Sequence, residues 1–214
     1  MAKGKHCLGL DIGSSSVKLC QVKGTKRGLQ LVHFDYAQLP PETIVDGSLL
    51  NSSVVADAIN ELLSRNKIKL RETALSVSGN TVIIRKITLP LMTQEELEES
   101  IQWEAEQYIP FDIKEVYIGF EVLAPRSEQQ QMDVVLVAAK REMIDDYTNV
   151  CVDVGLKPLV MDVDAFAMQN AYEVNSGFHQ NETVVLLDVG NPVVTTNVVT
   201  DGIMMFTRHL SLVG

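Results

Sequence analysis

The chain has 214 residues, 46% hydrophobic and 21% charged, and its 18 basic against 28 acidic side chains give a formal net charge of −10. This composition is typical of a globular protein and excludes intrinsic disorder. An acidic chain without a basic block does not favour nucleic-acid binding, because that binding needs Lys and Arg to neutralise phosphates. A basic partner surface suits the chain better.

The longest runs without a charged residue, 73–84 and 189–200, have twelve residues each. A membrane-spanning helix needs about 20 apolar residues, and the first apolar stretch is broken by Asp11, too early for a secretory signal. We therefore expect a cytoplasmic protein. The three cysteines form no C-x-x-C pair, which predicts free thiols rather than a disulfide framework or a zinc ribbon.

The first part of the chain has the pattern of an α/β sheet. Ser52 or Ser53 is expected to cap a helix that runs to about Arg65, and a buried strand follows at 73–77. This strand–helix–strand order favours an α/β domain. Before that helix, turn residues separate three β-rich runs of an antiparallel meander, at 7–12, 17–22 and 29–37.

A β-α-β-β-α block is predicted at about 81–156. Thr93 and Glu96 form a T-x-x-E capping box, and Pro110 is expected to end the helix that begins there. Its apolar stripe is predicted to comprise Leu97, Ile101, Ala105 and Tyr108. The other elements of the block are strands at 82–89, 116–123 and 132–139 and a helix at 141–154. A strand at 159–163 and a helix at 165–174 follow it.

The last 32 residues repeat the opening meander. Strands are predicted at 184–188, 193–199 and 203–209, and LDIG at 10–13 matches LDVG at 187–190. The same strand, Asp-x-Gly turn, strand, turn, strand order follows in both places, which makes the match an internal repeat.

A tight turn of small residues exposes backbone N–H groups that can converge on a phosphate. Lys18 could add a positive charge, and Asp11 could hold the water shell of Mg²⁺. Each Asp-x-Gly alone is also compatible with an ordinary hairpin turn. Two copies on duplicated meanders favour a polyphosphate clamp between two lobes.

The paired turns resemble the phosphate motifs of the actin and sugar-kinase superfamily, whose ribonuclease H-like lobes bind ATP with Mg²⁺. The segment 89–113, LPLMTQEELEESIQWEAEQYIPFDI, closely resembles the signature of the FtsA-like PilM family of type IV pilus assembly. The implied fold is an actin-like α/β lobe with an inserted FtsA-type subdomain 1C and a truncated second lobe. We therefore expect an N-terminal portion of a longer protein.

The resemblance divides the chain into four parts. These are the first part of subdomain 1A at 1–80, subdomain 1C at 81–156, the return of 1A at 157–180 and the start of the second lobe at 181–214.

The resemblance also implies roles for individual residues. Asp11 would organise the waters of Mg²⁺, Lys18 would contact phosphate, and Asp188 and Gly190 would face the γ-phosphate of ATP. The residues implied to cradle the other phosphates are Gly13, Ser14, Ser15 and Ser16.

The second turn departs from the superfamily pattern. Val193 and Val194 stand where a hydroxyl residue is common, and Pro192 removes a backbone donor. Both changes argue against fast hydrolysis more than against binding, because catalysis needs donors aimed at the transition state.

The implied function is that of an ATP-binding adaptor at the cytoplasmic face of the inner membrane. In the PilM family, the N-terminal peptide of PilN docks between subdomains 1A and 1C, and Pro110 with Phe111 is expected at an edge of this groove. The adaptor would link the PilN and PilO complex to the pilus assembly and retraction ATPases. The alternatives are an ATPase or kinase with real turnover, and an FtsA-like filament-forming protein.

Trp103 lies beside the apolar stripe of its helix, so we expect it to pack in a core or between subdomains, with partner binding as the alternative. The glutamates of this helix are expected to form a solvated face that could meet a basic protein. The sequence has no P-loop, no G-x-S-x-G motif and no histidines at metal-ligand spacing.

Overall fold

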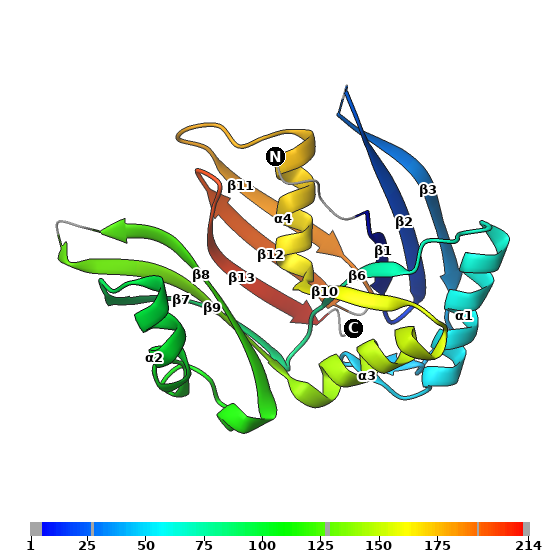
Figure 1. Ribbon diagram of the computed structural model, residues 1–214, viewed down its shortest axis with the longest axis horizontal. Coiled ribbons are helices and arrows are strands. Elements are labelled where there is room, and N and C mark those ends of the chain that lie inside the picture. The colour runs from blue at the N-terminus through cyan, green and yellow to red at the C-terminus, as the bar shows by residue number, and fades with distance from the viewer. Residues whose placement is uncertain (1–5, 27, 127–128, 192, 212–214) are drawn as a thin grey trace.

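The computed structural model describes residues 6–26, 28–126, 129–191 and 193–211. They form a five-stranded sheet, two three-stranded sheets and a small hairpin, with helices packed between and beside the sheets (Figure 1). Among these residues, no helix combines the length and the hydrophobicity that a bilayer span requires.

The five-stranded sheet contains the opening meander and two parallel strands, in the order β10-β6-β1-β2-β3. The strands β1, β2 and β3 pair antiparallel, whereas β6 pairs parallel with both β1 and β10. The predicted meander and the α/β class are therefore confirmed. The bounds are β1 (Leu8–Ile12), β2 (Ser16–Thr25), β3 (Gly28–Gln38), β6 (Glu72–Val77) and β10 (Lys157–Val163).

Helix α1 (Ser52–Arg65) packs on this sheet through an apolar stripe that includes Val55, Ile59 and Leu62. Its N-cap is Asn51, so the prediction of Ser52 or Ser53 is wrong. The helix begins at Ser52, and the Asn51 Oδ1 atom accepts a hydrogen bond from the Val54 N–H, a donor of the first turn that would otherwise lack a partner.

The second sheet has the order β7-β9-β8 and is antiparallel throughout. Helix α2 (Gln94–Glu106) covers one face of it, and the predicted capping box is present. The Glu96 N–H donates to Thr93 Oγ1 over 3.2 Å, and the Thr93 N–H donates to a Glu96 carboxylate oxygen over 2.7 Å. The strands are β7 (Val82–Pro90), β8 (Val116–Arg126) and β9 (Gln131–Lys140), and a short 3₁₀ turn, η1 (Ile113–Glu115), precedes β8.

Helix α2 ends at Glu106, four residues before Pro110, so the predicted end is wrong. The N–H groups of Tyr108 and Ile109 both donate to the Ala105 carbonyl, which turns the chain away from the helix axis. Tyr108 is consequently exposed, and Ile109 is the buried residue that follows Leu97, Ile101 and Ala105 in this core.

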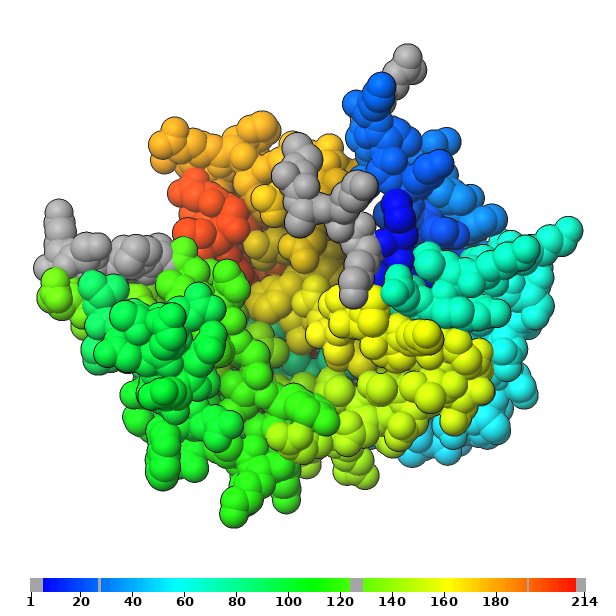
Figure 2. Space-filling view, viewed as in Figure 1, coloured from blue at the N-terminus to red at the C-terminus, as the bar shows by residue number. Residues whose placement is uncertain are grey.

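The described residues form two hydrophobic cores. The core of the second sheet lies between α2 and the strand residues on one face of β7, β8 and β9. Helix α3 (Arg141–Asp153) follows this sheet in the chain but packs on α1, and its residues Met143, Tyr147, Val150 and Cys151 belong to the core of the first sheet. We therefore propose that the inserted unit ends near residue 140. Figure 2 shows it as a green lobe beside the rest of the molecule.

The third sheet is the antiparallel meander β11-β12-β13, as the internal repeat predicts. Helix α4 (Asp164–Asn175) lies between it and the first sheet (Figure 1). The buried Asn197 side chain donates to the Ala165 carbonyl of this helix over 3.0 Å. The strands are β11 (Thr183–Val189), β12 (Val193–Thr200) and β13 (Ile203–Ser211).

We expect Leu97→Ala to lower the free energy of unfolding by about 2–5 kcal/mol, because Leu97 is fully buried under α2 and its removal leaves a cavity. Urea denaturation followed by circular dichroism measures this change. The control is Glu98→Ala, at the exposed neighbouring position. Equal stabilities of the two variants would contradict this account of the second core.

Candidate functional site

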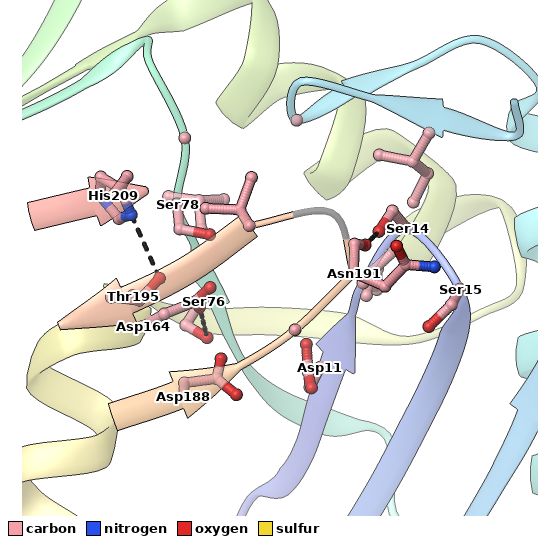
Figure 3. A pocket seen from close by; sticks show the side chains of 18 of the residues that line it. Asp11, Ser14, Ser15, Ser76, Ser78, Asp164, Asp188, Asn191, Thr195 and His209 are labelled. Carbon is pink, nitrogen blue, oxygen red and sulfur yellow. Dashed lines mark hydrogen bonds between the residues drawn. The ribbon is translucent and has the colours of Figure 1, made fainter. Parts of the chain in front are cut away.

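A pocket of about 340 Å³ lies between the first and third sheets. The first turn, residues 11–16, joins β1 to β2, and the second turn, residues 188–193, joins β11 to β12. Both turns line the pocket (Figure 3). Seven of the eight residues predicted for the site lie around it: Asp11, Gly13, Ser14, Ser15, Lys18, Asp188 and Gly190. Ser16 does not line it and instead begins β2.

The two turns are closed by the same hydrogen bond. The Gly13 N–H donates to the Ser16 carbonyl over 3.1 Å, and the Gly190 N–H donates to the Val193 carbonyl over 3.1 Å. A Cβ atom at Gly190 would lie 2.9 Å from that carbonyl oxygen, closer than a side chain tolerates. The repeat seen in the sequence is therefore a repeat of backbone geometry. The predicted effect of Pro192 lies outside the described residues.

The tips of the two turns touch. The Ser14 hydroxyl donates to the Asn191 carbonyl, 177 residues away in the chain. In Figure 3 these two residues lie close together beside the pocket, with Asp11 and Asp188 below them.

Among the described residues, the four carboxylates of Asp11, Asp46, Asp164 and Asp188 and the Lys18 ammonium set the charge of the pocket. Lys18 Nζ lies 2.7 Å from Asp11 Oδ2, and the Ser76 hydroxyl donates to Asp164. Burial raises the pKa of Asp188, the negative charges of Asp11 and Asp164 raise it further, and Lys18 opposes them. A cation in the pocket would relieve this repulsion.

The described residues contain no group of three or more His, Cys, Asp or Glu side chains placed to hold a metal ion. Mg²⁺ usually keeps several of its waters and uses only one or two carboxylates together with phosphate oxygens. The carboxylates of this pocket fit a hydrated Mg²⁺ that arrives with a polyphosphate.

Several residues of the pocket were not predicted from the sequence. Ser76 and Asp164 stand at the carboxyl ends of the parallel strands β6 and β10, where ligands of α/β sheets commonly bind, and that position was a usable signal. No such signal marked the hairpin of β4 (Ile44–Val45) and β5 (Ser48–Leu49) or the loop after β6. They contribute Asp46, Gly47, Ser78, Gly79 and Asn80.

Asp188, Thr195 and His209 form one row across the third sheet. Thr195 pairs with Asp188 on β11 and with His209 on β13, and all three line the pocket. Thr195 is only 3% exposed, and its Oγ1 lies 3.1 Å from His209 Nδ1 (Figure 3). A hydroxyl residue is common at the positions that Val193 and Val194 occupy. Thr195 thus supplies a hydroxyl group close to these two positions.

We expect the imidazole of His209 to titrate below its ordinary pKa of 6.5, because burial lowers the pKa more than the charge of Asp164 raises it. His209 then binds a proton less readily in the folded than in the unfolded state. Its contribution to the free energy of unfolding is therefore present above pH 6.5 and is lost as the pH falls below this value. Histidine ring signals in NMR, assigned with His209→Asn, measure the midpoint.

Thr195→Val is the control for this titration. Since burial rather than the hydroxyl is the main cause, the midpoint in this variant also stays below 6.5. A midpoint at or above 6.5 in the parent protein would contradict the prediction.

A second, mostly apolar groove of about 460 Å³ lies between the inserted sheet and the first sheet. It is bounded by residues 117–121 of β8, residues 161–163 of β10 and Phe166 of α4. Both β8 and β10 are edge strands. Burial raises the pKa of Asp162 in this groove. Pro110 and Phe111, expected at the edge of a groove between subdomains, lie outside its lining.

Residues 9–214 match the family described as type IV pilus assembly protein PilM. The chain belongs to the PilM family. It is also similar to a chain in a solved PilM–PilN type IV pilus biogenesis complex, with 32% identity and a TM-score of 0.88 over 98% of this chain and 62% of that one. The chain thus spans less than two thirds of the length of that PilM family relative.

More distant structures share the fold alone. The cytoplasmic domain of EpsL, an inner-membrane component of the type II secretion system of Vibrio cholerae, matches with 12% identity and a TM-score of 0.59, over 97% of this chain and 71% of that one. A Bacteroides thetaiotaomicron protein with an actin-like ATPase fold matches with 9% identity and a TM-score of 0.51, over 97% and 70%. The predicted actin-like α/β fold is confirmed.

Proposed function

We propose that this PilM family chain forms a Mg-ATP site between its two turns and acts as a nucleotide-dependent adaptor in type IV pilus assembly. The observation that carries the proposal is the pair of identically closed glycine turns, which face one pocket together with Lys18 and four carboxylates. Bound ATP would supply a polyphosphate charge that both the turns and Mg²⁺ can hold.

The residues of the pocket divide this work between the two lobes. The backbone N–H groups of Ser14 and Ser15 would face the phosphates from the first lobe, Gly13 would allow their close approach, and Lys18 would neutralise part of their charge. Asp11 and Asp188 would hold the waters of a bound Mg²⁺. The Ser14–Asn191 contact between the tips would be exchanged for contacts to phosphate, so that nucleotide would set the distance between the lobes.

Binding of ATP is expected to depend on Mg²⁺ and on Asp11. We expect Asp11→Asn to weaken Mg-ATP binding by about tenfold or more, equivalent to about 1.4 kcal/mol, because it removes the charge that orders the waters of the metal. Asp57→Asn, at an exposed position on α1, is the matched control and leaves the affinity unchanged. Calorimetric titration with and without Mg²⁺ measures both.

The nucleotide that stays bound distinguishes an adaptor from an enzyme. Intact ATP, recovered after gel filtration, supports a structural ligand, whereas prompt conversion to ADP supports an ATPase of the same superfamily. Sedimentation with nucleotide tests the filament-forming alternative. The absence of any bound nucleotide would overturn the proposed site.

We also propose that the groove between β8 and β10 receives the N-terminal peptide of a PilN-type partner. The relative of known structure was solved as a PilM–PilN complex, and two edge strands facing one apolar groove suit an extended peptide that adds main-chain hydrogen bonds. Through PilN and PilO the protein would be held at the inner membrane and linked to the pilus assembly and retraction ATPases.

Gly119 allows this groove to be blocked without disturbing the fold. It lines the groove, and a Cβ atom built on it meets nothing within 4 Å, so Gly119→Leu fills space that the peptide needs. We expect this variant to lose PilN-peptide affinity by about tenfold or more while retaining ATP. Gly24→Leu, equally unobstructed but on β2, is the control. Unchanged peptide binding in Gly119→Leu would place the peptide elsewhere.

A further inference from the structure

Trp103 is the single tryptophan of the chain, and 74% of it is exposed. The prediction that it packs in a core or between subdomains is therefore wrong. It stands two residues from both Ile101 and Ala105, which are buried under α2, and two residues are about 200° around a helix. The ring consequently points away from the sheet that α2 covers.

The helix surface around this ring is strongly acidic. Helix α2 contains six glutamates and no Lys or Arg. Glu95, Glu99 and Glu106 lie on the same outward side as Trp103, at spacings of three and four residues. Throughout the described ranges, the ion pairs of the structure involve none of these glutamates.

This arrangement destabilises the protein when no partner is bound. The first turn, with Glu95 and Glu96, is favoured by the helix dipole, but Glu99 is repelled by Glu95 one turn away. Glu104 and Glu106 stand in the last turn, where the dipole is already negative and no basic residue compensates. Charges that oppose the local preferences of a helix, and that no contact compensates, are typical of a functional surface. A positive partner would remove the cost.

We propose that the outer face of α2, formed by Glu95, Glu99, Trp103 and Glu106, docks a basic segment of a partner protein. An exposed tryptophan provides the large apolar anchor that dominates many interfaces. An arginine can stack on its ring and pair with the flanking carboxylates at the same time, which lysine does less well. Nucleic acids and anionic membranes carry the same sign of charge as this face and are repelled.

The face is separate from both sites described above. On β9, Val134, Leu136 and Ala138 pack toward α2, whereas the alternate residues Val135 and Val137 line the groove on the other side of the sheet. In Figure 1, α2 lies at the periphery of the molecule, away from the turns of the pocket. A partner on α2 can therefore bind together with nucleotide and with a peptide in the groove.

The fluorescence of Trp103 reports directly on this face. The probes are amphipathic peptides of about 18 residues, long enough to form a helix, with Leu on one side and Arg, Lys or Glu on the other. The Arg peptide is expected to shift the emission to shorter wavelength in a saturable, salt-sensitive manner. The Lys peptide binds more weakly, and the Glu peptide does not bind.

Two pairs of variants separate docking from a general effect of net charge. The double variant Glu99→Gln/Glu106→Gln is expected to lower the affinity for the Arg peptide by about tenfold. Trp103→Ala, measured by calorimetry, is expected to lower it by a similar factor. The control, Glu142→Gln with Asp153→Asn, removes two charges from α3, which is also 13 residues long, and leaves the affinity nearly unchanged. Only the α2 pair raises the melting temperature, since it removes repulsion within the helix.

Equal loss of peptide binding in the two pairs would overturn the proposal, as would full binding by Trp103→Ala. Self-association that disappears in Trp103→Ala would assign the face to a second copy of the chain, and binding of anionic vesicles through α2 would assign it to a membrane. Each of these results contradicts a basic protein segment as the occupant. None of them depends on nucleotide binding.

Discussion

The closure of the two glycine turns is the constraint on which the site depends. The hydrogen bonds from Gly13 to Ser16 and from Gly190 to Val193 fold each chain reversal so tightly that a side chain at Gly190 would collide with a carbonyl oxygen. Because each turn directly follows a strand that carries an aspartate, the geometry that exposes backbone donors also brings two carboxylates to one pocket. The proposed donors for an anion and the proposed ligands for a cation thus come from the same short motif.

The charge of the pocket follows from this duplication. Asp11 and Asp188 are brought together by the fold, and Asp46 and Asp164 add two more negative charges. Among the described residues that line the pocket, Lys18 alone opposes them. Such a site repels a bare polyphosphate and equally leaves a bare cation without enough direct ligands. A phosphate and metal pair satisfies both halves, which is the electrostatic reason for favouring Mg-ATP over either component.

The inserted sheet gives the molecule two further surfaces of opposite character. One face of β9 lines an apolar groove against the first sheet, and the other face is covered by α2, whose outer side is acidic and carries an exposed tryptophan. Strand alternation makes this division possible, since successive side chains point to opposite faces. The same short unit can therefore hold one partner in a groove and present a charged surface to another.

The sequence by itself determined the order and type of the α-helices and the longer strands, the capping box at Thr93 and the repeat of the glycine turns, because periodicity, caps and turns depend on neighbouring residues. Only the tertiary structure decided that Asp46 and His209 reach the pocket and that α3 packs on α1. It also decided that Trp103 faces outward. Those outcomes depend on how distant segments cross and which helix face meets a sheet, and no local pattern records either.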